Sequence, residues 1–136
     1  MTAPHITHRV ALTITSLLSI LLLTFHLTED ILRGFERGGP STYLGVLIMA
    51  VWLYATLVLI ERRSGYVIIL LASILGAGVP LIHMTGAGMA GGRIVNSSGR
   101  FFWVWTLIAL GVTASVSVIL AARGLWNSRA THRHAD

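Results

Sequence analysis

The stretch VALTITSLLSILLLTFHLTED, residues 10–30, decides how the rest of the chain is interpreted. Its apolar part, residues 10–27, contains no aspartate, glutamate, lysine or arginine, and the sequence then becomes polar at Glu29 and Asp30. A helix of about 20 residues rises about 30 Å, which is the thickness of the hydrocarbon core of a bilayer. Because no small-x-small cleavage site follows the run, we interpret it as a retained membrane-spanning helix and not as a signal peptide.

The composition of the whole chain is that of an integral membrane protein. Of its 136 residues, 54% are hydrophobic and only 11% are charged, which lies outside the range of soluble domains. The absence of cysteine excludes disulfides and thiolate metal sites. The net charge of +5 comes from arginines placed singly or in pairs between apolar runs. We interpret these arginines as topology signals, and we expect no nucleic-acid partner.

Three further apolar runs complete a four-helix pattern. The predicted spans are residues 10–27, 43–60, 66–84 and 101–122, followed by a short polar tail, residues 123–136, that we expect to be loose. A two-residue turn, Ser64-Gly65, makes the second and third spans antiparallel neighbours. The predicted fold class is therefore all-α: a single transmembrane domain, residues 1–136, folded as a four-helix up-down bundle in contact with the lipid bilayer.

Small and hydroxyl side chains indicate which helix faces pack together. Ala72 with Gly76, and Gly111 with Ser115, have the four-residue spacing that allows two helix backbones to approach closely in lipid. Thr15 and Ser19 of the first span lie on roughly the same face as His26, and we expect that face to look into the bundle. The small-residue faces could equally contact a second copy of the chain or another membrane subunit.

The arginines in the short loops predict the orientation. Six lie on the side of the chain termini and four on the opposite side. The first group is Arg9, Arg62, Arg63, Arg123, Arg129 and Arg133, and the second is Arg33, Arg37, Arg93 and Arg100. This difference places both termini in the cytoplasm, and the compact, lysine-free chain is interpreted as a bacterial inner-membrane protein. An aromatic belt is expected on the outer side, formed by Tyr43, Phe101, Trp103 and Trp105.

Five ionisable side chains are predicted to gather at the outer end of the bundle. Four of them follow at i, i+3, i+4 and i+7 on one face of the first helix, and the fifth belongs to the third helix, which runs in the same direction. They are His26, Glu29, Asp30, Arg33 and His83. The two histidines are expected to lie at similar depth, about one turn inside the hydrocarbon.

This cluster has three chemical interpretations that use the same residues. Facing helices assemble metal sites in this way, with His26, His83 and Glu29 as ligands, or Asp30 as the carboxylate, and Arg33 as charge partner. Two opposed histidines could instead ligate the iron of a haem b axially. The third possibility is a proton relay or a polar headgroup site, because an imidazole can accept and donate a proton near neutral pH.

A purely structural interpretation uses the same side chains. Glu29 and Asp30 can each form an ion pair with Arg33 within the helix, and His83 can hydrogen-bond a carbonyl freed by Pro80. The protein would then be a non-catalytic accessory subunit of a larger membrane complex. An enzyme that acts on a lipid headgroup, with the same histidine and carboxylate cluster as acid and base, ranks third. No nucleophile with a neighbouring base is recognisable. In the third loop, Arg93 and Arg100 could contact an anion such as a lipid phosphate.

Overall fold

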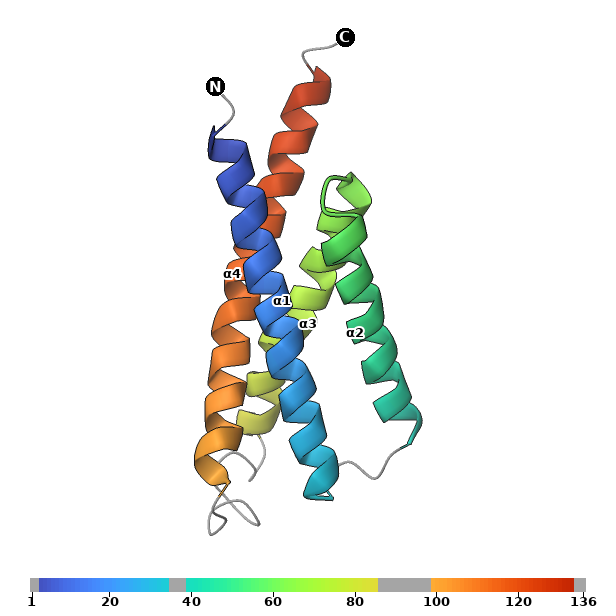
Figure 1. Cartoon of the computed structure of the whole chain (residues 1–136), viewed down its shortest axis with the longest axis vertical. Coiled ribbons are helices and arrows are strands. Elements are labelled where there is room, and N and C mark those ends of the chain that lie inside the picture. The colour runs from blue at the N-terminus through green and yellow to red at the C-terminus, as the bar shows by residue number, and fades with distance from the viewer. Residues whose placement is uncertain (1–2, 35–38, 86–98, 134–136) are drawn as a thin grey trace.

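The computed structural model describes residues 3–34, 39–85 and 99–133. These ranges form four helices and contain no strand: α1 (Ala3–Leu32), α2 (Pro40–Val58), α3 (Arg63–Thr85) and α4 (Arg100–Arg133). Successive helices alternate in direction, so the two ends of the chain lie at the same end of the molecule (Figure 1). All four helices are long and apolar enough to cross a membrane, which confirms the predicted all-helical pattern of four candidate spans.

α1 and α4 extend furthest beyond the predicted spans. α1 already begins at Ala3, and α4 continues to Arg133, so the tail that was expected to be loose is helical as far as that residue. The physical reason is that neither glycine nor proline interrupts residues 125–133, and a helix formed inside the bundle can continue outward through them. α1 ends at Leu32, and Gly34, two residues later, has a φ of 71°, the left-handed conformation that glycine adopts without steric penalty.

The turn between α2 and α3 lies before its predicted position. The Leu59 N–H donates to the Ala55 carbonyl at 3.1 Å, and the Arg62 N–H donates to the Leu59 carbonyl at 2.8 Å. Residues 59–62 therefore make the turn, and the predicted turn Ser64-Gly65 is instead the first turn of α3. A Cβ atom at Gly65 would collide with the Leu59 carbonyl. The glycine thus permits α3 to start directly against the turn, and it does not form the turn itself.

The small residues of α3 and α4 allow close helix packing at two positions. A Cβ atom on Gly76 would lie 3.2 Å from the Trp52 ring and 3.4 Å from the Ala114 methyl group, so α3 closely approaches both α2 and α4 there. A Cβ atom on Gly111 would lie 2.9 Å from the Pro80 ring. Ser115 differs from the prediction, because it is exposed and its hydroxyl donates to the Gly111 carbonyl of its own helix.

Hydroxyl groups link the helices in the interior, as expected for the face of α1 that carries Thr15 and Ser19. Ser19 donates to Thr113 at 3.0 Å, and Ser117 donates to Thr15 at 2.9 Å, so α1 and α4 are joined twice. Hydrogen bonds between helices are a main source of helix association in lipid. These two contacts confirm that this face of α1 looks into the bundle.

A second polar group joins α1 to α2. The Trp52 indole N–H donates to the Ser16 hydroxyl at 2.7 Å, and Ser16 and Thr56 lie 2.7 Å apart, oxygen to oxygen. Because the Thr56 hydroxyl donates to the Trp52 carbonyl at 2.9 Å, Ser16 is the donor to Thr56. The group is therefore closed, with every donor used, at a position where all three side chains are fully buried.

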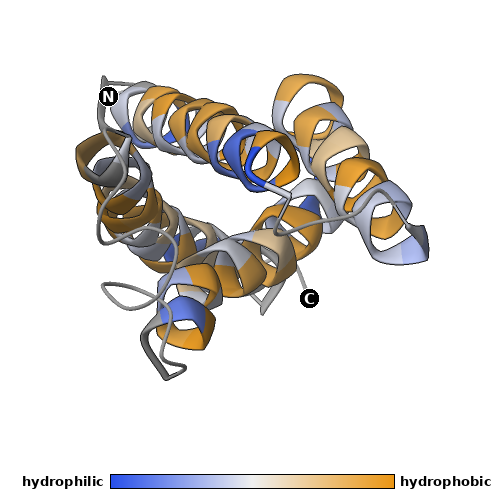
Figure 2. Cartoon of the chain, turned by 90° about the horizontal axis from the view of Figure 1, so that it is seen from below, coloured by the Kyte–Doolittle hydropathy of each residue, from blue (hydrophilic) through white to orange (hydrophobic). Residues whose placement is uncertain are grey.

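The outward faces of the four helices are apolar (Figure 2). Large side chains such as Leu21, Leu47, Leu71 and Val112 are about half exposed, which suits contact with lipid acyl chains. α2 lies at one side of the bundle and buries little of itself (Figure 1). Its buried residues are Trp52, Ala55 and Thr56.

Candidate functional site

His26, Asp30 and His83 meet at the end of the bundle opposite the chain termini. Oδ2 of Asp30 lies 3.5 Å from Nε2 of His26 and 3.6 Å from Nε2 of His83. The two imidazole rings contact each other edge to face, with centroids 4.9 Å apart. The expectation that both histidines lie at the same depth and on facing helices therefore agrees with the structure.

The helices position these side chains by simple spacing. His26 and Asp30 are four residues apart on α1, so they lie on one face, and both are buried. His83 comes from the last turns of α3, which runs in the same direction as α1 (Figure 1). Their ligand-type atoms, one from each residue, all lie within 4.8 Å of one another.

Trp103 of α4 is the fourth member of this site. It was predicted to belong to an aromatic belt on the outer side of the membrane, but its side chain is buried inside the bundle and its indole N–H donates to Oδ1 of Asp30 at 2.8 Å. Its ring centroid lies 5.3 Å from each imidazole centroid. The signal for its burial is helical spacing, because Trp103 begins the interior stripe of α4 that continues through Leu107, Leu110, Ala114, Ser117 and Ala121.

A backbone contact fixes the protonation pattern of His83. Nδ1 of His83 lies 2.9 Å from the Val79 carbonyl oxygen, which can only accept a hydrogen bond. Nδ1 therefore carries the proton, and in the neutral ring Nε2 carries a lone pair directed toward Asp30. The carbonyl is not the one freed by Pro80: the missing N–H of that proline would have served Gly76, four residues earlier.

The remaining lone pairs of the cluster converge. Oδ1 of Asp30 is used by Trp103 and Nδ1 of His83 by Val79, so Oδ2 of Asp30 and Nε2 of His83 face each other. Both ring nitrogens of His26 are buried and have no hydrogen-bond partner among the described residues. Buried polar atoms in native proteins are nearly always satisfied, and an exception calls for an explanation such as a bound ion. The arrangement is suited to a cation or to a shared proton.

Glu29 and Arg33 lie outside this group of lone pairs. Oε1 of Glu29 accepts from Nε of Arg33 at 2.9 Å and from Nη2 of Arg33 at 2.6 Å, which realises the predicted ion pair within the helix. The carboxylate that joins the two histidines is thus Asp30 and not Glu29. The group of ligand-type atoms that lie close together is therefore His26, Asp30 and His83, and it does not include Glu29, which was predicted as a ligand.

The cluster does not fit a haem. Two axial histidines must lie on opposite faces of the porphyrin, with the macrocycle between them. Here the rings of His26 and His83 touch each other, and Asp30 and Trp103 occupy the space around them. No plane of that size can separate the two rings in this arrangement.

A small pocket opens beside the cluster. It has a volume of about 220 Å³ and lies among α1, α2 and α3. Its lining includes His26, Asp30, His83, Gly45 and Met49, together with Leu23, Leu27 and Val79. The pocket can hold water or a small ligand next to the three ligand-type atoms. The predicted anion contacts cannot be added to this site, because Arg93 and the side chain of Arg100 lie outside the described residues.

No protein-family model, no curated protein and no solved structure matches this chain. The function is therefore inferred from the chemistry of the site.

Proposed function

We propose that this protein is a multi-pass membrane protein that binds one divalent transition-metal ion through His26, Asp30 and His83. The observation that carries the proposal is the convergence of three unshared ligand atoms, Nε2 of each histidine and Oδ2 of Asp30, from two parallel helices. Metal sites in helical bundles are built from such facing side chains.

The distances suit a metal site that needs only a small adjustment. Metal bonds of about 2.0 to 2.2 Å in tetrahedral geometry put neighbouring ligand atoms about 3.3 to 3.6 Å apart. The two nitrogen to oxygen distances, 3.5 and 3.6 Å, fall in this range. The ligand-type atoms of the whole cluster lie within 4.8 Å of one another, so the most distant pair would have to move closer together when a metal ion binds.

The ligand types indicate which ions fit. Imidazole nitrogen with one carboxylate oxygen suits Zn²⁺, Fe²⁺, Cu²⁺ and Ni²⁺ better than Mg²⁺ or Ca²⁺, which prefer oxygen. The contacts of Val79 and Trp103 supply the outer hydrogen bonds that normally orient ligating side chains. Three protein ligands leave a coordination position for the contents of the pocket, so the site is open and exchangeable.

The proposed membrane position rests on the arginines and not on the metal site itself. We infer that both termini face the cytoplasm of a bacterial cell and that the metal site lies near the outer boundary of the inner membrane. The six arginines on the terminal side against four on the other side support this orientation. A site at that depth would exchange its ion with the outer aqueous phase.

Metal analysis of the full chain in mild detergent tests the proposal. The protein carries no histidine tag, and His132 and His134 are replaced by alanine in every sample, so that the tail cannot hold metal. We expect one Zn²⁺ per chain after desalting. His26→Ala and His83→Ala should each weaken binding at least about 100-fold, because each removes one of three ligands.

A histidine from the other end of α1 provides the matched control. His8→Ala removes the same functional group from the same helix but lies far along the chain from the site, and it should leave the zinc affinity unchanged. Co²⁺ provides a second readout, because its visible spectrum reports nitrogen and oxygen ligands directly. Zinc binding that is substoichiometric, or that survives both His26→Ala and His83→Ala, would overturn the proposal.

One observation favours a second function, as a subunit of a larger membrane complex. α2 buries three residues, and an apolar groove of about 340 Å³ runs between α2 and α3. Val51, Leu71 and Leu75 line this groove and are about half exposed. Cross-linking from Val51→Cys in native membranes would identify a partner subunit or a second copy, whereas labelling by lipid alone would contradict this function. The chain has no other cysteine to interfere.

A further inference from the structure

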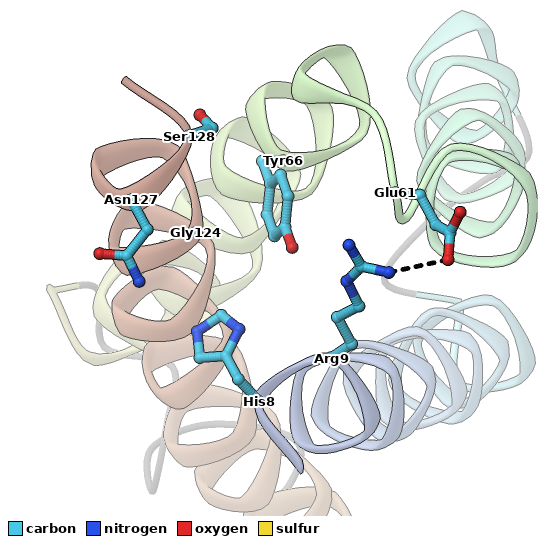
Figure 3. Close-up of a pocket in the computed structure, with 7 residues that line it drawn as sticks. All are labelled: His8, Arg9, Glu61, Tyr66, Gly124, Asn127 and Ser128. Atoms are coloured by element: carbon cyan, nitrogen blue, oxygen red, sulfur yellow. Dashed lines mark hydrogen bonds and ion pairs between the residues drawn. The ribbon is translucent and has the colours of Figure 1, made fainter. Parts of the chain in front are cut away.

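A second polar pocket lies at the opposite end of the bundle, close to the chain termini (Figure 3). It has a volume of about 230 Å³ and is lined mainly by polar side chains from α1, the turn before α3, α3 itself and α4. These are His8, Arg9, Glu61, Tyr66, Asn127 and Ser128. None of these residues belongs to the proposed metal site.

The pocket exists because two helices approach each other closely at Gly124. A Cβ atom at that position would overlap the Tyr66 ring, so the ring lies directly on the backbone of α4. The ring is buried, and its hydroxyl end points toward the space beside Arg9 (Figure 3). The glycine thus positions a hydroxyl group at the floor of a cavity between helices.

Several hydrogen-bond donors face this cavity. Nε2 of His8 is buried without a hydrogen-bond partner among the described residues. Arg9 uses Nη1 to donate to Oε1 of Glu61 at 2.8 Å, on the outer side of the pocket, and the rest of its guanidinium turns toward Tyr66 (Figure 3). Ser128 contributes less, since its hydroxyl donates to the Leu125 carbonyl.

The charge around the pocket is positive. Among residues whose side chains are described at this end of the bundle, four arginines stand against the single carboxylate of Glu61. They are Arg9, Arg62, Arg63 and Arg123. A guanidinium with spare donors, an imidazole and a phenol hydroxyl are together the groups that bind phosphate oxygens.

We propose that this pocket binds a phosphate group. Arg9 would hold two phosphate oxygens, with His8 and the Tyr66 hydroxyl as further donors. The pocket lies where apolar helices emerge from the predicted hydrocarbon region, which is the depth of lipid headgroups. The phosphate can therefore belong to an anionic lipid or to a soluble phosphate ester. The lipid form rests on the proposed membrane position and is independent of the metal site.

Binding of short-chain lipids to the full chain in detergent tests the proposal. The probes are dioctanoyl phosphatidic acid, dioctanoyl phosphatidylcholine and inorganic phosphate, each titrated while the melting temperature and the mass of the intact complex are recorded. We expect saturable binding of one phosphatidic acid per chain, and weaker binding of the zwitterionic lipid. Binding of inorganic phosphate alone would indicate a soluble ligand, and binding of the lipid alone a headgroup; either result supports the site.

Matched variants separate the pocket from the general positive charge. Arg9→Gln should weaken binding at least about tenfold, because it removes charged hydrogen bonds. Arg123→Gln removes the same charge from the same end of the bundle without touching the pocket, and should change binding less than about twofold. Glu61→Gln should strengthen binding about threefold, because it frees Nη1 of Arg9 from a competing carboxylate.

Tyr66→Phe keeps the ring against Gly124 and deletes only the hydroxyl, so it should fold normally and bind about threefold more weakly. Equal losses in Arg9→Gln and Arg123→Gln, or a linear and unsaturable response to phosphatidic acid in the parent protein, would overturn the proposal.

Discussion

The two ends of the bundle use similar side chains in opposite environments. At one end, the side chains of His26 and Asp30 are 3% and 10% exposed, and the indole N–H of Trp103 donates a hydrogen bond to the Asp30 carboxylate. At the other end, the paired Arg9 and Glu61 are 46% and 74% exposed. The same kinds of charged and polar groups therefore affect stability differently. Loss of the buried carboxylate leaves its hydrogen-bond donor unsatisfied, whereas the groups of the exposed pair can exchange each other for solvent or a ligand.

The largest effect should come from removing the buried carboxylate. Asp30→Ala leaves the Trp103 indole N–H without an acceptor in a buried position, and we expect the free energy of unfolding to fall by about 2.5 kcal/mol. Glu61→Ala at the other end should cost less than about 0.5 kcal/mol, because the exposed pair with Arg9 contributes little. Reversible unfolding in mixed detergent micelles measures both values.

Asp30→Asn is the control for shape. Its amide oxygen can still accept from Trp103, so it should recover at least half of the loss in stability while still lacking the charge that a metal ion needs. Equal losses in the free energy of unfolding for Asp30→Ala and Glu61→Ala would show that burial does not distinguish the two ends of the bundle.

The second effect concerns the tryptophan that holds the carboxylate. Trp103→Phe keeps an aromatic ring beside both histidines but deletes the donor to Oδ1 of Asp30, and should cost about 1.5 kcal/mol of unfolding free energy. It should also weaken zinc binding about tenfold, because outer hydrogen bonds orient metal ligands.

Trp105→Phe is the matched control for this prediction. Trp105 lies two residues further along α4 and is largely exposed, so its replacement should change neither stability nor zinc affinity. A loss in zinc affinity that is equal in the two variants would mean that Trp103 acts on the general fold of α4 and not on Asp30.

The third effect lies between the two ends, in the hydroxyl contacts of α1 and α4. Ser19→Ala removes the hydrogen bond to Thr113, and should cost about 0.6 kcal/mol, the average for such bonds between helices in a membrane. Ser115→Ala removes a hydroxyl that bonds only its own helix at an exposed position, and should be neutral. A cost for Ser115→Ala as large as that for Ser19→Ala would place the packed face of α4 elsewhere.

The four helices were predictable because apolar runs long enough to cross a bilayer are a strong signal for membrane-spanning helices. The runs at residues 10–27, 43–60, 66–84 and 101–122 each lie inside or nearly inside an observed helix. The ends were less predictable, since the polar residues after Ala122 carry no hydropathy signal, while the absence of glycine and proline from residues 125–133 allows the helix to continue. The position of the α2–α3 turn depended on a contact between Gly65 and Leu59, which no local pattern shows.

The proximity of His26 and His83 was predictable, because the first and third spans run in the same direction and the two histidines were expected at similar depth in the membrane. The identity of the third member was not, because Glu29 and Asp30 are adjacent and differ by only one helical position. Arg33 forms an ion pair with Glu29, whereas Trp103, from a distant part of the chain, donates a hydrogen bond to Asp30. Trp103 was missed because tryptophan near a helix end usually marks the membrane interface, and tertiary packing overrode that tendency.

The smallest effect, and the sharpest comparison, is the response of the two ends to salt. In a double-mutant cycle with Arg9→Gln and Glu61→Gln, the coupling energy should be about 0.5 kcal/mol at low salt and should nearly vanish at 1 M salt, where screening acts over about 3 Å. The corresponding cycle with Asp30→Ala and Trp103→Phe should give a coupling that salt does not change, because solvent ions do not reach a buried hydrogen bond. A salt-sensitive coupling at Asp30 would mean that solvent ions reach the hydrogen bond between Asp30 and Trp103, and the difference in burial between the two ends would then be absent.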